Sequence, residues 1–520
     1  MLENVNSGAK KMLKELFLLQ NATYFRTFAF VFLKFDFSNS LELDTLLPFL
    51  HSESAYIKSY AVTRIKLLMK RFFYTLLYII GALTAQAQDE FSVPADFVFD
   101  VDSSNDSLLF DEMVMDIDQV WKYNMIANID SMARASERGG ASTCICIYDV
   151  TADSMMYRYN HQRKQIPAST QKLLVSISAL TSLSPEYEFR TNVYSQGHIE
   201  EDSLQRKFFK GDFYIAGNFD PTLEYSDIRA IAMRMKEMNA DSIDGHIYVD
   251  VHQKDALMAD RRYSWERVTA EQEYFITPLQ FNNARVSLDV PGANPRQRSG
   301  RVRHPELYFA TALQRTLESY GIRFSMQDAT GVGYVPENAR RVYSHVTPIK
   351  KVLQDMMKSS NNFYAESMLL QLCNEKSNGR WTYDACRKTI EDVMVKRAGC
   401  SYSDFIVIDG SGLSHSNKVT AEAEVKLLKY AYDNKRIFNH LYNSLPIAGV
   451  DGTLKSRMHS GNAYANVRAK TGTVNGVSTL AGYVTASNGH TLIFSILNNN
   501  IGASATGRAF QDKICQEMAK

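Results

Sequence analysis

The sequence predicts a mixed α/β chain of the α+β kind, because segments with helical spacing and segments with strand-like patterns gather in separate regions. Apolar residues recur at helical spacing in three stretches, 120–134, 348–372 and 421–433. A final helix is expected after the last of four strand-like runs, at 143–148, 155–159, 478–486 and 491–497. The stretch between the two ends, 187–345, predicts a β-rich insertion, because Gly, Asp, Asn and Pro turns separate short strand-like segments such as 213–216, 246–251 and 285–288.

The composition is ordinary for a globular protein. The 520 residues are 45% hydrophobic and 22% charged, which allows two or three domains. With 58 basic and 57 acidic residues, the formal net charge is +1. Such a balance gives no overall field to attract nucleic acid or an anionic membrane surface. We expect no nucleic-acid partner and no cofactor.

A secretion signal is predicted inside the chain rather than at its first residue. From Met69 the sequence reads MKRFFYTLLYIIGALTAQAQDEF, with a basic start, an apolar stretch over 72–83 and a small-residue cleavage pattern. The apolar stretch is shorter than the roughly 20 residues that a spanning helix needs, so a membrane anchor is the weaker interpretation. We expect a signal peptide over 69–88, cleaved near Ala87 or Gln88, and a periplasmic protein without strong membrane association.

Residues 1–68 precede this signal, which is unusual because export signals act at the emerging N-terminus. We expect translation to begin at Met69 and residues 1–68 to be spurious, with a genuine N-terminal extension as the alternative. An acidic linker rich in Asp and Ser follows the signal, over 89–111.

The chain has six cysteines, Cys144, Cys146, Cys373, Cys386, Cys400 and Cys515. An even number in an exported chain is compatible with disulfides, whose pairing stays open. The first two lie two residues apart in a predicted strand and so share a face. No Cys/His cluster has the spacing of a zinc site, so we predict no metal.

Ser169 and Lys172 form the first candidate catalytic pair. Pro167 precedes the serine at the start of a long helix-forming run, so both side chains fall on one helical face. A serine hydroxyl becomes a useful nucleophile only when a base removes its proton, and lysine can do this if burial or nearby positive charge keeps it neutral. The spacing alone is weak evidence, since Ser7 and Lys10 share it.

Two further motifs follow in the order typical of serine acyl-transferases. Ser360-Asn361-Asn362 lies at the start of a helical stretch or within it, and Lys470-Thr471-Gly472-Thr473 lies at an apparent strand edge. Lys-Thr-Gly occurs once in the chain, and a strand follows it as the signature requires. The candidate catalytic residues are Ser169, Lys172, Ser360 and Asn362. The candidate substrate-binding residues are Lys470, Thr471, Gly472 and Thr473.

The catalytic set fits acyl transfer from a D-alanyl peptide. Ser169 would attack the carbonyl of the penultimate D-alanine, and Lys172 would accept its proton. Ser360 would relay a proton towards the leaving amine. Asn362 would hold the lysine and the substrate amide by hydrogen bonds.

The third motif fits substrate binding. Lys470 and Thr471 would bind the terminal carboxylate. Gly472 would leave the strand edge bare for a peptide. The backbone N–H groups of Ser169 and Thr473 would form an oxyanion hole.

With these motifs the chain resembles the class C low-molecular-mass penicillin-binding proteins, the D-alanyl-D-alanine carboxypeptidase/endopeptidases with a large inserted region. The resemblance covers most of residues 120–515. It includes several longer strings, PAST at 167–170, GNFDPTL at 217–223, SNNFYAE at 360–366, DGSGLS at 409–414, LPIAG at 445–449, DGTL at 451–454 and LAGY at 480–483.

The resemblance implies a penicillin-recognising serine transpeptidase fold of the β-lactamase-like type, an antiparallel sheet flanked by helices and built from both ends of the chain. It implies a catalytic domain over 112–186 and 346–520, interrupted by inserted β-rich domains over 187–345. It also implies DD-carboxypeptidase or DD-endopeptidase action on peptidoglycan stem peptides, with β-lactam antibiotics as covalent inhibitors.

Two alternatives stay open. A β-lactamase shares the acylation groups but needs a further base for deacylation, and we find no candidate between the first two motifs. An inactive cell-wall binding module would keep the fold alone, whereas every nucleophile, base and relay position is filled here. The histidines show no Ser/His/Asp pattern, and the turns at 220–221 and 409–412 are interpreted as structural. Glu366 is expected to orient the active-site helix or to cap a polar network.

Overall fold

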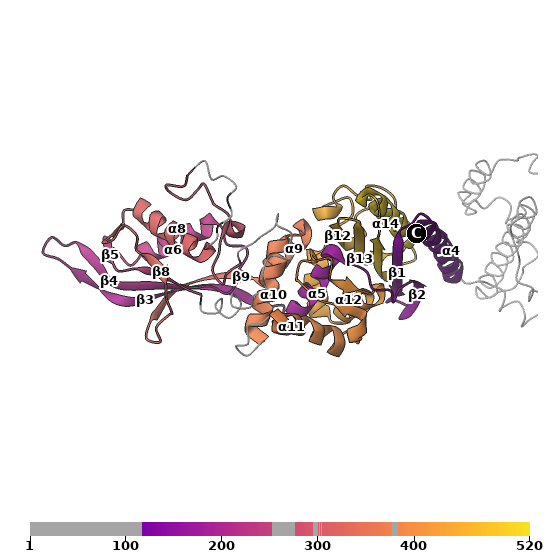
Figure 1. Cartoon of the computed structure of the whole chain (residues 1–520), viewed down its shortest axis with the longest axis horizontal. Coiled ribbons are helices and arrows are strands. Elements are labelled where there is room, and N and C mark those ends of the chain that lie inside the picture. Colours follow the sequence, from indigo (N-terminus) through magenta and orange to yellow (C-terminus); the bar gives the residue numbers. More distant parts are fainter. Residues whose placement is uncertain (1–116, 252–275, 295–299, 301, 303, 377–382) are drawn as a thin grey trace, which may run out of the picture. The chain divides into compact units, whose positions relative to one another are not determined.

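The computed structural model describes residues 117–251, 276–294, 300, 302, 304–376 and 383–520 (Figure 1). The expected N-terminal extension, signal peptide, cleavage site and linker lie outside the described residues. Within the described ranges, no helix combines the length and the apolar character needed to cross a bilayer.

One five-stranded antiparallel sheet is assembled from both ends of the chain. Its order is β12-β13-β14-β1-β2. The strands are β1 (Ser142–Asp149), β2 (Ser154–Tyr159), β12 (Arg468–Val474), β13 (Val477–Thr485) and β14 (Thr491–Asn499). In the central pair, Ser142 lies opposite Asn499 and Asp149 lies opposite Leu492. The strands expected near both ends agree with these bounds to within about two residues, and the expected antiparallel sheet is confirmed.

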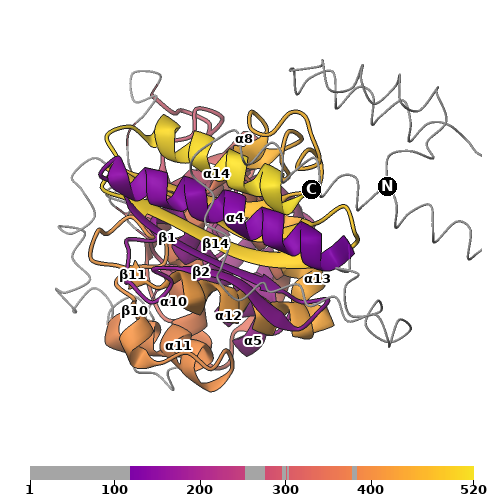
Figure 2. The same cartoon turned by 90° about the vertical axis from the view of Figure 1, so that its right-hand side faces the viewer.

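Helices cover both faces of this sheet (Figure 2). On one face pack α4 (Ile117–Arg138) and α14 (Ser504–Met518). The other face is covered by α5 (Gln171–Ser182), α9 (Ile349–Ser359), α10 (Asn362–Lys376), α11 (Tyr383–Lys396), α12 (Ala421–Asp433) and α13 (Lys435–Ser444). In β1, Ile145 and Ile147 belong to the first core, whereas Cys144 and Cys146 belong to the second. The alternation of side chains along a strand therefore feeds two separate cores.

The helices expected at 120–134 and 421–433 are confirmed as α4 and α12. The single stretch expected over 348–372 is two helices, because Ser360 interrupts it. Ser360 has φ 58° and ψ 37°, the left-handed conformation that closes a helix, and its N–H donates to Met356 O. The second motif therefore spans the break between α9 and α10, with Ser360 and Asn361 in the break and Asn362 as the first residue of α10.

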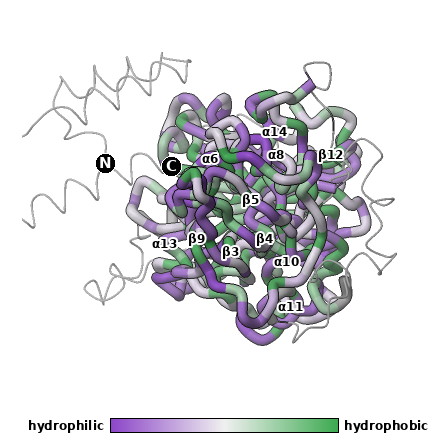
Figure 3. The backbone as a smooth tube through the Cα atoms, turned by 90° about the vertical axis from the view of Figure 1, so that its left-hand side faces the viewer, coloured by the Kyte–Doolittle hydropathy of each residue, from purple (hydrophilic) through white to green (hydrophobic). Residues whose placement is uncertain are grey.

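A second, mixed sheet is formed by residues 188–348, with the order β7-β5-β4-β3-β9 and with β6 paired to β4 and β8. Its strands are β3 (Glu188–Glu201), β4 (Lys207–Ala216), β5 (Ser242–Asp244), β6 (Ile247–Asp250), β7 (Arg323–Phe324), β8 (Thr330–Val332) and β9 (Arg340–Pro348). Two helices, α6 (Tyr225–Lys236) and α8 (Pro305–Ser319), share one hydrophobic core with this sheet. Figure 3 shows this region end-on, with hydrophilic and hydrophobic stretches alternating along the chain.

Neither α6 nor α8 follows from the strand-like patterns, although both begin with signals that could have revealed them. Glu224 and Asp227 form a reciprocal capping box at the start of α6, and Pro305 opens α8. The expectation of a strand at 285–288 is wrong. The preceding residues, Asn282–Ala284, form a 3₁₀ turn with φ values from 51° to 55°, which breaks an extended chain.

Four of the cysteines, Cys144, Cys146, Cys400 and Cys515, are buried free thiols. Burial raises the pKa of Cys144 to about 11 and that of Cys146 to about 12. These thiols therefore behave as small apolar core residues rather than as nucleophiles.

Candidate active site

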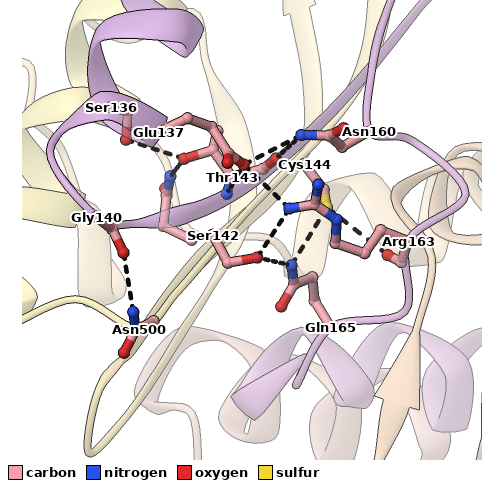
Figure 4. A network of polar contacts seen from close by, with 11 residues as sticks. Ser136, Glu137, Gly140, Ser142, Thr143, Cys144, Asn160, Arg163, Gln165 and Asn500 are labelled. Atoms are coloured by element: carbon pink, nitrogen blue, oxygen red, sulfur yellow. Dashed lines mark hydrogen bonds and ion pairs between the residues drawn. The ribbon is translucent and has the colours of Figure 1, made fainter.

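A polar network fixes the segment that leads to the candidate nucleophile (Figure 4). Glu137 Oε1 accepts hydrogen bonds from Asn160 Nδ2 and Arg163 Nη1, both at 3.1 Å. Gln165 Nε2 donates to Ser142 Oγ at 2.5 Å. These contacts tie the segment to α4 and β1, the helix and strand at the start of the described chain.

Ile166 and Pro167, at the end of this segment, are held by side chains of the C-terminal strands. Asn499 Oδ1 accepts from Ile166 N at 2.8 Å, and Asn499 Nδ2 donates to Ile166 O at 3.2 Å. Thr479 Oγ1 donates to Pro167 O at 2.6 Å. The approach to Ser169 is therefore fixed by hydrogen bonds to β13 and β14.

Ser169 lies in a 3₁₀ turn, Ala168–Thr170, that leads directly into α5. Ala168 has a φ of 48°, in the left-handed region that residues other than glycine rarely adopt. Such strain persists only where the surroundings enforce it. The Ser169 side chain stays half-buried, so a substrate can reach it.

Lys172 is fully buried one helical turn after Ser169. Its Nζ donates to Ser169 Oγ at 2.9 Å, to Asn362 Oδ1 at 2.7 Å and to the Ser411 carbonyl at 2.6 Å. The structure thus brings the first and second motifs together around one amine. When Lys172 is neutral, the 2.9 Å contact is short enough for Nζ to accept the Ser169 proton instead.

Lys470 makes a second serine–lysine contact beside the first. Its Nζ donates to Ser360 Oγ at 2.8 Å and to Thr471 O at 2.7 Å. Thr471 Oγ1 donates to Thr453 Oγ1 at 2.7 Å. Because Ser360 Oγ accepts from Lys470, its own O–H can point at a reacting group.

Gly472 is required by close packing of β12 against the nucleophile turn. A Cβ atom at this position would lie 2.1 Å from Thr479 Oγ1 and 2.9 Å from Ser169 N. The strand edge that the sequence analysis expected to be open for a peptide is therefore packed against the protein at Gly472. The missing side chain leaves space for the turn that carries Ser169. Thr473, the next residue of β12, has an exposed side chain.

The charge states of the two lysines follow from burial. Burial lowers the pKa of Lys172 from 10.5 to about 7, although the Glu366 and Asp409 carboxylates act in the opposite direction. Burial also lowers the pKa of Lys470 well below its ordinary value, and the neighbouring Lys172 ammonium adds to this effect. Lys172 can therefore be neutral near neutral pH, as a general base must be.

Three partners of the motif residues were not identified from the sequence. The Ser411 carbonyl is a backbone group, so no side-chain pattern could reveal its contact with Lys172. Thr453 lies in the DGTL string and Thr479 directly precedes the LAGY string, two of the strings that carry the family resemblance. Within the turn at 409–412, Asp409 Oδ1 accepts from Gly412 N at 2.6 Å, which stabilises the turn.

In the described part of the chain, no group of three or more His, Cys, Asp or Glu side chains is placed to hold a metal ion.

A helix-flanked antiparallel sheet, with a Ser-x-x-Lys helix facing a Lys-Thr-Gly strand, defines a penicillin-recognising serine hydrolase. The comparisons agree with this class. Residues 125–290 and 271–520 match the model of the D-Ala-D-Ala carboxypeptidase 3 (S13) family. The chain belongs to this family.

Two curated relatives cover most of their own length. A D-alanyl-D-alanine carboxypeptidase of an Actinomadura species is 28% identical over 464 residues, which are 76% of this chain and 84% of the relative. D-alanyl-D-alanine carboxypeptidase DacB of Haemophilus influenzae is 23% identical over 414 residues, 68% of this chain and 85% of the relative.

Solved structures confirm the fold. The crystal structure of penicillin binding protein 4 from Haemophilus influenzae has a TM-score of 0.62 at 21% identity and covers 75% of this chain and 98% of its own. A structure of the same protein complexed with a β-lactam has a TM-score of 0.60.

Proposed function

We propose that this chain is an exported serine DD-peptidase that cleaves D-alanyl-D-alanine ends or cross-links of peptidoglycan through an acyl-enzyme on Ser169. The observation that carries the proposal is the 2.9 Å contact between Lys172 Nζ and Ser169 Oγ, made by a lysine whose pKa burial brings to about 7. The family and the names of the curated relatives support the substrate class.

Acylation begins when neutral Lys172 removes the Ser169 proton and Oγ bonds to the carbonyl carbon of the penultimate D-alanine. Backbone N–H groups of Ser169 and Thr473 stabilise the resulting oxyanion. When the C–N bond breaks, the Ser360 hydroxyl, which accepts a hydrogen bond from Lys470 at 2.8 Å, passes its proton to the leaving amine. The proton that Lys172 took from Ser169 then replaces it, so Lys172 is neutral again and Lys470 keeps its charge. Asn362 keeps Lys172 in place throughout.

Substrate binding falls to the third motif. The terminal carboxylate lies against Lys470 and the Thr471 hydroxyl, which pairs with Thr453. Water then hydrolyses the acyl-enzyme. A carboxypeptidase and an endopeptidase share these steps and differ in the group beyond the scissile bond, a free D-alanine or a cross-linked side chain.

The test uses a short N-acylated peptide ending in D-Ala-D-Ala and a fluorescent penicillin. We expect the purified chain to release D-alanine and to carry a long-lived penicilloyl label, and Ser169→Ala to do neither. Rapid hydrolysis of the penicillin with only transient labelling would indicate a β-lactamase. Folded protein that neither labels nor releases D-alanine would indicate an inactive cell-wall binding module.

Export and domain division belong to the same proposal. We infer that translation begins at Met69, that residues 69–88 direct export to the periplasm, and that 112–186 and 346–520 form a catalytic domain interrupted by 187–345. The division is supported by strands of the catalytic sheet coming from both sides of the second sheet. N-terminal sequencing of the exported protein should start near Asp89; a start within residues 1–68 would contradict this.

A further inference from the structure

A buried turn at 409–414 presents a carbonyl to the catalytic lysine. Lys172 Nζ donates to Ser411 O at 2.6 Å, and the N–H of the same peptide unit, that of Gly412, donates to Asp409 Oδ1 at 2.6 Å. The turn also touches the nucleophile segment, since a Cβ on Gly412 would lie 1.8 Å from Ala168 O. The turn therefore cannot move without disturbing both Lys172 and the residue before Ser169.

Glu366 on α10 holds this turn from behind. Its Oε1 accepts from Ser411 N at 2.8 Å and its Oε2 accepts from Gly410 N at 3.1 Å. Glu366 is 5% exposed, and its two oxygens are occupied by backbone N–H groups of the turn. Among the described residues, no ion pair joins Glu366 to a cationic side chain, so the two backbone N–H groups offset the cost of burying its carboxylate.

The charged groups around Lys172 come from three elements. Glu366 on α10 and Asp409 in the turn favour its protonated form, whereas Lys470 on β12 repels it. Burial, with a further contribution from the Asp409 carboxylate, raises the pKa of Glu366 to about 7. Another buried acid near α5, Glu424 on α12, accepts from Ser495 Oγ at 2.7 Å and also interacts with the Thr170 hydroxyl.

We propose that Glu366 is a positioning residue for the DD-peptidase reaction, which holds the Ser411 carbonyl against Lys172 and places a carboxyl group behind that contact. This inference rests on the proposed function. Glu366 acts through the turn and does not touch the reacting atoms. The arrangement keeps the amine aimed at Ser169 in both protonation states, because the carbonyl accepts from a neutral or a charged amine.

The test is the pH dependence of penicillin acylation, measured with the full chain carrying Glu366→Gln. Glutamine keeps the shape and one acceptor but removes the charge. Without the carboxylate the Lys172 ammonium loses a stabilising charge, so the pKa of Lys172 falls. The acid limb of the acylation rate should move to lower pH by about half to one unit. The rate on the plateau should fall roughly tenfold, because Gly410 or Ser411 loses its acceptor.

Glu424→Gln is the matched control, since it removes an equally buried carboxyl that interacts with Ser495 and Thr170 and, unlike Glu366 and Asp409, is not among the groups that shift the pKa of Lys172. Its acid limb should stay where it is in the unmodified chain. If Glu366→Gln folds and the acid limb of its acylation rate stays at the same pH, the proposal is overturned and Glu366 has a purely structural role. An equal movement in Glu424→Gln would also overturn it, because any buried charge would then suffice.

If Glu366→Gln does not fold, Asp409→Asn is measured instead. The acid limb of its acylation rate should also move to lower pH. Failure of both variants to fold would assign these carboxylates to stability and contradict the proposal. The unmodified chain separates the two hypotheses. If it does not react with penicillin at all, the proposed function fails; if it reacts and only the limb is unaffected, the role of Glu366 fails.

Discussion

The site contains two serine–lysine contacts in different surroundings. One lies on the α5 face around Lys172, and the other lies at the β12 edge around Lys470. Both lysines are fully buried, and each donates to a serine hydroxyl, at 2.9 Å and 2.8 Å respectively. On the α5 face, Glu366 and Asp409 partly offset the burial of Lys172. At the β12 edge, the neighbouring charge is another cation, Lys172 itself.

This difference assigns the two lysines different tasks. Burial lowers the pKa of Lys172 to about 7 against the opposing effect of the two carboxylates, and at this pKa an amine can alternate between base and acid. Lys470 gains a full counter-charge only when a ligand supplies one, and the terminal carboxylate of a D-alanyl peptide is such a ligand. In the proposed mechanism, neighbouring charge rather than residue type or burial therefore distinguishes Lys172 as the base from Lys470 as the carboxylate-binding group.

The largest expected effect is that of removing the base. Lys172→Ala should lower the rate of penicillin acylation at least ~10³-fold, because Ser169 then has no group to take its proton. The rate is measured by stopped-flow or gel labelling, with thermal unfolding as the control for folding. Near-normal labelling of the folded variant would end the assignment of Lys172 as the base.

Lys470→Ala should have a smaller and more selective effect. We expect kcat/KM to fall about 10- to 100-fold for a peptide with a free terminal carboxylate, the cost of losing a charge-assisted hydrogen bond. A matched peptide with an amidated terminus should lose little further activity. Equal losses for both peptides would show that Lys470 does not act through the carboxylate.

The pH profile distinguishes the two lysines in the unmodified chain. Lys172 must be neutral to act, so the acylation rate should rise with pH through about 7 and fall about tenfold for each unit below it. Lys470 must be charged to bind, so affinity for a carboxylate ligand should weaken as pH rises. Binding is measured by calorimetry with a non-hydrolysable ligand, and affinity that strengthened with pH would reverse the assignment.

Thr453→Val should have the smallest effect. It removes the acceptor of the Thr471 hydroxyl but keeps the volume, so KM for the carboxylate substrate should rise about threefold to tenfold with kcat nearly unchanged. Thr453→Ser restores the hydroxyl and should restore KM. A fall confined to kcat would place Thr453 in the chemical step instead.

The sequence predicted the residues that meet around the two lysines, because each motif carries its chemistry in side chains. Ser169, Lys172, Ser360, Asn362 and Lys470 are the residues that it named, and the structure brings them together. It could not predict the Ser411 carbonyl, since backbone groups leave no side-chain pattern. The break at Ser360 was equally hidden, because a left-handed serine looks like any other residue in a helical stretch.

In the region of the second sheet, by contrast, the strand-like patterns led to an incomplete prediction. Short strands and turns were correctly expected, but α6 and α8 lie among them with one apolar face each. Their capping signals were present at Glu224 and Pro305. Tertiary packing of those faces against the sheet, which no single-segment pattern records, makes these stretches helical.

The central claim is the acyl-enzyme on Ser169, and peptide mapping tests it most directly. The chain is incubated with benzylpenicillin, digested and examined by mass spectrometry, with Ser169→Ala alongside. The account predicts one penicilloyl group on the peptide that contains Ser169, and none in the variant. A penicilloyl group on any other residue, or the same label in Ser169→Ala, would contradict it.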